Sequence, residues 1–232
     1  MCDKTLSSEN FCQEQPLLLK HLEAVLQHNH KKNLTSITEK DAGKVFHIED
    51  SLAVLPEVEG APPGQMADLG SGAGFPGIPL ALVSGRHTTL LESNKKKAQF
   101  LQGFLEENEL LSRIGVIAAR SEEAALEQPD AFAAVTARAV ASLPALLELA
   151  APLLMLGGHF IALKGKPDSA ELEKAALAAE KLSMHLISTR AYTLNYKGEE
   201  NQRLVLVYKK TAAPSIPLPR RPGMATKRPL SS

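Results

Sequence analysis

The sequence is poor in the residues from which disulfide frameworks and metal sites are built. Its 232 residues include two cysteines, Cys2 and Cys12, and no tryptophan. Neither cysteine lies in a CxxC pair or near histidine or aspartate at ligand spacing, so we expect neither a disulfide framework nor a metal site. So few cysteines suit a reducing compartment. Because the first residues also lack the charged start and apolar core of a secretory signal, we expect the protein to be cytoplasmic.

Net charge and uninterrupted hydrophobic segments are also missing. Lys+Arg and Asp+Glu both number 26, so any affinity for nucleic acid must come from local patches. Residues 139–163 are largely apolar and long enough to span a bilayer, which takes roughly 20 residues, but they contain Pro144, Glu148, Pro152 and two adjacent glycines. We therefore expect a helix and then a strand here, and no membrane association. The sequence shows no heptad repeat, and we expect a monomer.

Three regions differ in their residue pattern. Residues 1–60 carry apolar side chains at helical spacing, including Leu18, Leu22 and Val25, which predicts an N-terminal helical extension. From 61 to 210, short apolar runs alternate with longer amphipathic ones, as in a mostly parallel α/β sheet. Residues 211–232 are rich in proline and basic residues, which predicts a tail that packs no core and is extended or disordered when alone.

The alternating region predicts a Rossmann-like order of strands and helices. We expect five strands, at residues 66–69, 88–92, 114–118, 132–136 and 160–163. Amphipathic helices are expected at residues 78–82, 95–107, 143–155 and 170–182. Two further β-like runs, 185–194 and 203–208, flank a polar turn at 197–201 and predict a C-terminal antiparallel hairpin. Methyltransferases of the Rossmann-like class add such a hairpin to the sheet.

The most informative segment is the glycine-rich turn DLGSGAGFPG, which follows the first expected strand at residues 68–77. Glycines let the backbone approach a ligand closely, and the preceding acid, Asp68, can accept a hydrogen bond from the ligand or order the turn. Gly70 and Gly72 are therefore expected to lie against a cofactor. Residues 72–77 also match GxGxxG, so a nicotinamide cofactor and a purely structural turn stay open as alternatives.

Neighbouring residues favour S-adenosyl-L-methionine over a dinucleotide. An acid two residues before the first glycine, here Asp68, is usual in methyltransferases that use this cofactor, whereas dinucleotide folds keep that strand end apolar. Pro76 and Pro79 withhold amide donors that a pyrophosphate would need. Glu92 closes the second expected strand, where an acid can bind the ribose hydroxyls of either ligand. We therefore predict S-adenosyl-L-methionine as the cofactor.

Longer strings of the sequence match a known family in order. They are NLTS at 33–36, HIEDS at 47–51, DLGSGAGFPGIPLAL, LLESNKKKAQFL, ARSEE, TARAVASLPALLELAAPLL and ALKGK. Together they resemble the bacterial small-subunit ribosomal RNA guanine-N7 methyltransferases, also called glucose-inhibited division protein B. The resemblance covers about residues 33–164, and the basic tail is similar to the ending of some members. One position departs: Phe132 is followed by Ala133, where the family commonly has an acid.

The resemblance implies a set of cofactor contacts beyond the glycine turn. Asp68, Gly70 and Gly72 belong to the turn itself, and the further expected contacts are Phe75, Ser121, Glu122 and Arg138, with Glu92 at the ribose.

The resemblance assigns no catalytic residue but leaves three candidates. Arg138, Lys164 and His47 match family positions around the cofactor edge of the sheet. Each has a structural alternative, which is a surface ion pair for Arg138, a solvated strand end for Lys164 and packing for His47.

The resemblance also implies a reaction and a substrate. The expected reaction is methylation of guanine N7 in the decoding-region loop of 16S ribosomal RNA, free or within the small subunit. Because N7 offers a lone pair and carries no proton, the reaction needs alignment and no general base. Cations expected to bind RNA phosphates are Lys95, Lys96, Lys97, Lys164, Arg220, Arg221, Lys227 and Arg228. The alternatives are a methyltransferase of this fold acting on a small molecule or protein, and a non-catalytic RNA or ribosome binder.

Overall fold

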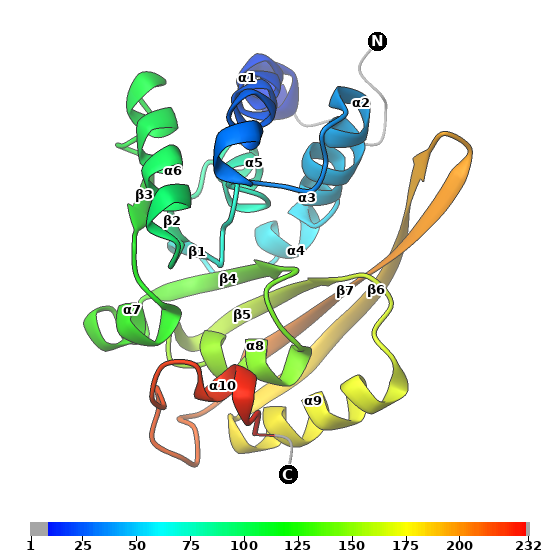
Figure 1. The fold of residues 1–232 in the computed structure, drawn as a ribbon. Coiled ribbons are helices and arrows are strands. Elements are labelled where there is room, and N and C mark those ends of the chain that lie inside the picture. Colours follow the sequence, from blue (N-terminus) through cyan, green and yellow to red (C-terminus); the bar gives the residue numbers. More distant parts are fainter. Residues whose placement is uncertain (1–8, 231–232) are drawn as a thin grey trace.

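A seven-stranded sheet forms the centre of the computed structural model, which describes residues 9–230 (Figure 1). Its order is β3-β2-β1-β4-β5-β7-β6. The first five strands are parallel, and β7 runs antiparallel to both of its neighbours. The strands are β1 (Met66–Leu69), β2 (Thr88–Leu91), β3 (Ile114–Ile117), β4 (Phe132–Arg138), β5 (Leu154–Lys164), β6 (Met184–Tyr196) and β7 (Glu199–Lys210). The mostly parallel sheet and the antiparallel hairpin are confirmed.

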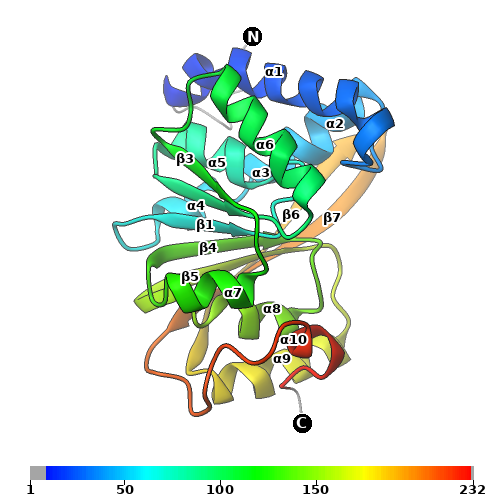
Figure 2. The same ribbon diagram turned by 60° about the vertical axis from the view of Figure 1, so that its left-hand side comes forward.

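Helices cover both faces of the sheet. Those from the N-terminus through α6 lie on one face and those from α7 on lie on the other (Figures 1 and 2). The first group is α1 (Glu9–Lys32), α2 (Lys40–Gly43), the π-helix η1 (Lys44–Glu49), α3 (Asp50–Leu52), α4 (Leu55–Glu59), α5 (Gly77–Ser84) and α6 (Lys95–Glu107). The second group is α7 (Ser121–Glu127), α8 (Leu143–Ala150), α9 (Ser169–Lys181) and α10 (Met224–Lys227).

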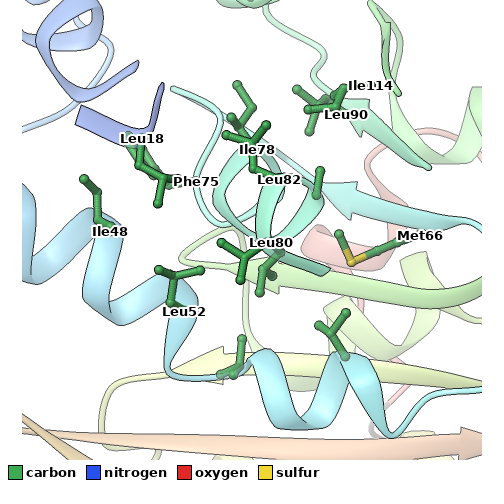
Figure 3. Packing of buried hydrophobic residues seen from close by; sticks show 14 of the residues in the cluster. Leu18, Ile48, Leu52, Met66, Phe75, Ile78, Leu80, Leu82, Leu90 and Ile114 are labelled. Atoms are coloured by element: carbon green, nitrogen blue, oxygen red, sulfur yellow. The ribbon is translucent and has the colours of Figure 1, made fainter. Parts of the chain in front are cut away.

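Two hydrophobic clusters, one on each face, follow from the alternation of side chains along the strands. Val205 and Val207 of β7 belong to the cluster under the N-terminal helices, whereas Leu206 and Tyr208 belong to the opposite one. Leu18 of α1 packs in the first cluster near Phe75 of the glycine turn (Figure 3). The helical extension therefore shares a core with the sheet.

Strand β5 departs from the sequence prediction. The expected helix over 143–155 ends at Ala150, and β5 begins at Leu154. The two adjacent glycines do not stop a helix; they lie inside a bulge, where the pairing with β4 jumps from Phe132–Leu154 to Ala134–His159. Gly157 has φ +83°, and a Cβ atom at Gly158 would lie 2.9 Å from the Met155 carbonyl oxygen. These backbone demands explain the glycine pair.

The C-terminal hairpin is longer than predicted. The expected five-residue polar turn is reduced to Lys197 and Gly198, with φ of +50° and +84°. Both strands continue through the polar residues beside this turn, where the ribbon leaves the sheet and approaches α2 (Figure 1). Most side chains beside this turn are exposed, although Leu194 is buried and Tyr196 packs against Phe46.

The C-terminal tail was predicted to pack no core, and this is wrong. Residues up to 230 fold back onto α8, form the short helix α10 and bury Ala225. Arg220 donates to Glu148, which is 3% exposed, with 2.6 Å between Nε and Oε1. The tail is held by this ion pair despite its composition.

The sequence predicted neither a membrane-spanning helix nor a metal site. Across residues 9–230, no helix is long and apolar enough to cross a membrane, and residues 139–163 contain α8, a short connection and most of β5. The same stretch of chain holds no group of three histidine, cysteine, aspartate or glutamate residues placed to bind a metal. Cys2 lies outside the described residues, and Cys12 is exposed on α1.

Candidate functional site

The sequence-predicted residues converge at the carboxyl edge of the sheet. The strand order reverses between β1 and β4, so their carboxyl ends open a crevice there. The glycine turn follows β1, Glu92 follows β2, and Arg138 and Lys164 end β4 and β5. Parallel strands thus place residues almost 100 positions apart in the sequence at one edge.

The glycine turn holds its backbone in the left-handed region. The φ angles are +72° at Gly70, +58° at Gly72 and +96° at Gly74, which other residues rarely adopt. Space is also limited at Gly70, where a Cβ atom would lie 2.5 Å from the Val140 side chain. The turn therefore presents bare backbone beside the segment that follows β4.

Asp68 lies beneath this turn and orders it. Its side chain is fully buried, and its two oxygens accept hydrogen bonds from Thr136 Oγ1 at 2.9 Å and from the Gly77 amide at 3.1 Å. Burial raises the pKa of Asp68 to about 6, although these hydrogen bonds oppose the shift. Of the two roles open to this acid, the structure shows the ordering of the turn.

Glu92 faces a cavity of about 340 Å³ beside the turn. Its carboxylate accepts hydrogen bonds from the amides of Gly72 at 2.8 Å and Asn94 at 2.7 Å. The side chain thereby joins the turn after β1 to the start of α6. Gly70, Phe75 and Arg138 line the same cavity.

His47 of η1 forms a wall of this cavity. Its ring stacks on Phe75 with 4.6 Å between centroids and 8° between planes. Arg138 Nη2 lies 3.3 Å from His47 Nδ1, and because a guanidinium only donates, Nδ1 accepts. Nε2 then carries the ring proton and donates to Thr35 Oγ1 at 2.9 Å. Burial and the charge of Arg138 lower the pKa of His47 to about 3, so the ring is neutral.

Sequence reasoning missed His21, which connects α1 to the glycine turn. Its Nε2 lies 2.8 Å from the carbonyl oxygen of Ala73, and its ring centroid is 4.4 Å from that of Phe75. The side chain is fully buried, and burial lowers its pKa to about 4. No local signal marks this residue, because its partners lie more than 50 positions along the chain.

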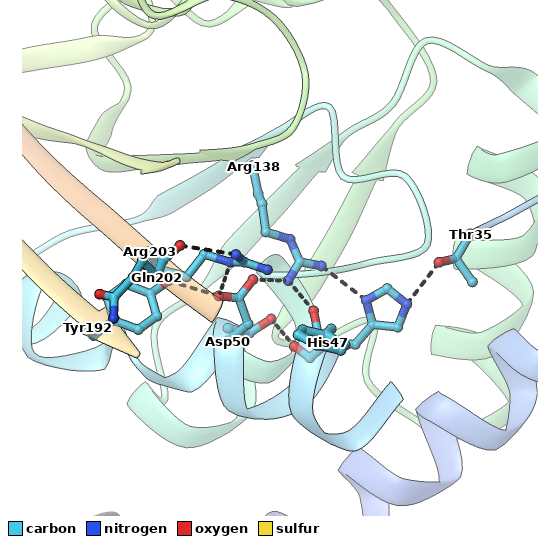
Figure 4. Close-up of polar contacts among 9 residues, drawn as sticks. Thr35, His47, Asp50, Arg138, Tyr192, Gln202 and Arg203 are labelled. Atoms are coloured by element: carbon cyan, nitrogen blue, oxygen red, sulfur yellow. Dashed lines mark hydrogen bonds and ion pairs between the residues drawn. The ribbon is translucent and has the colours of Figure 1, made fainter. Parts of the chain in front are cut away.

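Arg138 also borders a second cavity, of about 680 Å³, which shares His47 and Thr35 with the first. Here Arg138 Nη1 donates to Asp50 Oδ2 at 2.8 Å and to the Phe46 carbonyl at 2.9 Å. Asp50 Oδ1 accepts from Tyr192 at 2.9 Å (Figure 4). Burial raises the pKa of Tyr192, which keeps this hydroxyl protonated.

Asp50 is therefore the centre of a polar network that joins η1, β4 and the hairpin (Figure 4). The sequence marked Asp50 as part of a family string without assigning it a role. It gave no signal for Tyr192 or Arg203, which come from the hairpin more than 140 residues later.

The predicted RNA-binding cations fall into two places. Lys95, Lys96 and Lys97 open α6 at the carboxyl edge of the sheet, and Lys97 lines the smaller cavity. Lys164 lines the larger one, where it donates to Glu171 at 2.7 Å. The second place is the tail, whose cations are Arg220, Arg221, Lys227 and Arg228. Only Arg220 of these side chains is ion-paired among the residues that the structure describes.

Ser121 and Glu122 do not line the smaller cavity. They begin α7, where Ser121 Oγ donates to the Glu122 carboxylate at 3.2 Å. The other oxygen of Glu122 accepts from the Gly223 amide in the tail at 2.6 Å. The side chain of Glu122 thus fixes the tail to α7.

Comparison with known proteins identifies the family of this chain. A model of the family described as rRNA small subunit methyltransferase G, or GidB, matches residues 14–205. The chain belongs to this family. Relatives named ribosomal RNA small subunit methyltransferase G include one from Carboxydothermus hydrogenoformans, 40% identical over 92% of this chain and 91% of its own length. Another, from Desulfitobacterium hafniense, is 36% identical over 90% of this chain and 87% of its own length.

Solved structures confirm the fold of this GidB-family chain. An O-methyltransferase from Bacillus cereus, solved in complex with SAH, aligns with a TM-score of 0.56 at 22% identity over 82% of this chain and 91% of that one. A predicted O-methyltransferase from Agrobacterium tumefaciens gives a TM-score of 0.55 at 20% identity, over 71% and 83%. The fold is that of class I methyltransferases.

The family assignment also decides between the cofactors considered from the sequence. The chain is a methyltransferase of the GidB family, and S-adenosylmethionine is its cofactor. The alternative of a nicotinamide cofactor on residues 72–77 is therefore wrong. Pro76 and Gly77 of that string begin α5, where the amide of Gly77 is already donated to Asp68.

Proposed function

We propose that this chain methylates N7 of a guanine in the decoding-region loop of 16S ribosomal RNA. Support comes from two sources. The relatives are named for the RNA of the small ribosomal subunit. The two cavities meet at a shared wall of Thr35, His47, Arg138 and Ala139, so a base in the larger cavity would adjoin a cofactor in the smaller one.

The observation that carries the proposal is the state of the polar groups at this wall. Both ring nitrogens of His47 are hydrogen-bonded, and its pKa of about 3 leaves it a weak base. Asp50 is 4% exposed and already accepts from Arg138 and Tyr192. Among the described residues, neither group is available to remove a proton. Methylation of a hydroxyl or exocyclic amine requires loss of a proton, whereas N7 has none to lose.

The smaller cavity fits S-adenosylmethionine. We propose that Glu92 accepts the ribose hydroxyls and that the backbone of Gly70 and Gly72 borders the cofactor, while Asp68 acts only by ordering the turn. Arg138 suits the cofactor carboxylate, because a guanidinium pairs with carboxylates in a planar geometry. When bound, the cofactor supplies an electrophilic methyl group, which bonds to the N7 lone pair while the electrons of the broken C–S bond stay on sulfur.

The chain's own contribution is alignment and electrostatics. The stacked His47 and Phe75 rings and the Arg138–Asp50 pair fix the wall between the two cavities, so both reactants meet in a constant geometry. Transfer moves the positive charge onto the guanine. Asp50, a buried carboxylate on the larger cavity, lies where it lowers the energy of that cation.

Cations around both cavities suit the RNA backbone. We propose that Lys95, Lys96 and Lys97 bind phosphates near the cofactor edge and that Lys164 does so at the larger cavity. In the tail, Arg221, Lys227 and Arg228 remain candidates for the same role. We assign Arg220 instead to the tail's attachment, since its guanidinium already pairs with buried Glu148.

Transfer of radiolabelled methyl to 16S RNA and to unmodified small subunits, followed by nuclease mapping, tests this function. We expect label in 7-methylguanosine within the decoding-region loop. Label in small molecules or proteins alone would favour the alternative of a methyltransferase with another substrate. Binding of RNA and cofactor without any transfer would favour a non-catalytic binder.

A further inference from the structure

The larger cavity is built from three separate parts of the chain. Phe46 and Asp50 come from the helical extension, Lys164 ends β5, and Asn201 and Arg203 lie on β7 of the hairpin. With its volume of about 680 Å³ and its shared wall with the cofactor cavity, it is the place where the target base would lie. A group on its walls can recognise guanine only if it has a hydrogen-bond donor that is not already used within the protein.

The cations on this cavity differ in how fully they are engaged. Arg138 is held at 2.8 Å by Asp50 and also donates to Phe46 and His47. Lys164 is held at 2.7 Å by Glu171. Arg203 is held more loosely, with its Nε 3.5 Å from Asp50 Oδ1.

Arg203 is positioned but retains an unused donor. Nη1 donates to the carbonyl of Gln202 at 3.2 Å, and the guanidinium carbon lies 5.9 Å from the centre of the Phe46 ring. Within the described part of the chain, Nη2 has no hydrogen-bond partner. The side chain is 26% exposed and borders the cavity beside Asp50 (Figure 4).

Guanine and adenine differ next to N7 in a way that such a donor detects. Guanine carries the acceptor O6 beside N7, whereas adenine carries the N6 amino donor there. An arginine that binds both N7 and O6 would block methylation, so a guanine-N7 methyltransferase needs a donor that reaches O6 alone. We propose that Arg203 reads guanine through a hydrogen bond from Nη2 to O6, which leaves N7 free; this inference rests on the proposed function.

Arg203→Gln tests this role with two RNA substrates. One is 16S RNA with guanine at the mapped position, and the other carries 2-aminopurine there, which keeps N7 and lacks O6. For the wild type, we expect transfer to 2-aminopurine to be roughly 10- to 100-fold slower than to guanine. R203Q should lose a similar factor on guanine and little on 2-aminopurine. Inosine, which keeps O6 and lacks the 2-amino group, should follow guanine in its response to R203Q.

Lys209→Gln is the matched control, because Lys209 is also an exposed cation on β7. It lies at the far end of the strand, opposite His159 of β5 and His185 of β6 in the sheet. K209Q should not change the ratio between the substrates, and calorimetry should show unchanged cofactor affinity in R203Q. If R203Q loses the same factor on guanine and on 2-aminopurine, the proposed role of Arg203 is overturned and the proposed function is not. Absence of wild-type transfer to the guanine RNA would overturn the proposed function as well.

Discussion

Arg138 and Asp50 form an ion pair with 2.8 Å between Nη1 and Oδ2, and their side chains are 15% and 5% exposed. The pair joins the carboxyl end of β4 to the helical extension, 88 residues earlier in the chain. Because Arg138 borders both cavities, the position of its guanidinium depends on a residue outside the Rossmann-like sheet. The extension is thus part of the site.

Asp50→Asn should therefore affect both stability and activity. The substitution leaves a largely buried Arg138 without its counter-ion, which costs about 3 kcal/mol in the free energy of unfolding. Displacement of Arg138 and Arg203 should also lower kcat/KM for RNA by about 100-fold. Asp41→Asn is the control, because Asp41 is 73% exposed and, among the described residues, forms an ion pair with Lys44 alone. Similar urea midpoints for the two variants would contradict the importance of the pair.

Gly70→Ala should weaken cofactor binding through steric conflict. Gly70 and Gly85 have similar φ angles, +72° and +69°, so alanine at either should cost about 1 kcal/mol of stability. A Cβ atom meets Val140 at 2.5 Å only at Gly70, and Gly85 has nothing within 4 Å. Calorimetry should show a loss of S-adenosylmethionine affinity in G70A and none in G85A. Val140→Ala should restore part of the loss, and equal affinities in both glycine variants would argue against this geometry.

The elements that local pattern determines were predicted best. Strand alternation and the glycine turn placed β1, β2, Glu92 and Arg138 at one edge of the sheet, because parallel topology follows from the order of elements. Contacts made by tertiary packing were not predictable. Nothing near Tyr192 in the sequence indicates a bond to Asp50, 142 positions away.

The tail shows that composition, too, does not predict tertiary contacts. Its prolines and basic residues suggested an extended segment, yet one ion pair to Glu148 and a few apolar contacts fix it on α8. Asp68 shows that a motif residue can act from beneath the ligand site, since both of its oxygens are taken by Thr136 and Gly77.

His21 should make the protein sensitive to acid. Its pKa is about 4 in the folded state against the ordinary value of 6.5 in the unfolded chain, so between these pH values the unfolded chain binds more protons. Stability is therefore fully present above pH 6.5 and falls as the pH drops toward 4, by about 3 kcal/mol at most. His21→Phe should lose the bond to Ala73 at neutral pH and remove the part of this dependence that His21 contributes, while His47, whose pKa is also lowered by burial, keeps its own part. Urea denaturation should show that the difference in free energy of unfolding between wild type and H21F is smaller at pH 4.5 than at pH 7. An equal difference at both pH values would refute this role of His21.

Tail arginines should separate into structural and RNA-binding roles. Arg220→Gln leaves Glu148 buried without its partner and should lower the free energy of unfolding by about 3 kcal/mol. Arg221→Gln combined with Lys227→Gln alters two exposed cations and should leave stability within about 0.5 kcal/mol. The double variant should bind RNA more weakly, with a smaller dependence on salt. Unchanged affinity across salt concentrations would remove these tail cations from RNA binding.

The target atom can be tested directly by changing it. In 16S RNA that carries 7-deazaguanosine at the mapped position, a C–H group replaces N7 and every other hydrogen-bonding group of guanine remains. We expect the protein to bind this RNA with unchanged affinity and to transfer no methyl group to it. Transfer at the rate seen with guanosine would contradict methylation at N7. It would also contradict the account in which neither His47 nor Asp50 removes a proton.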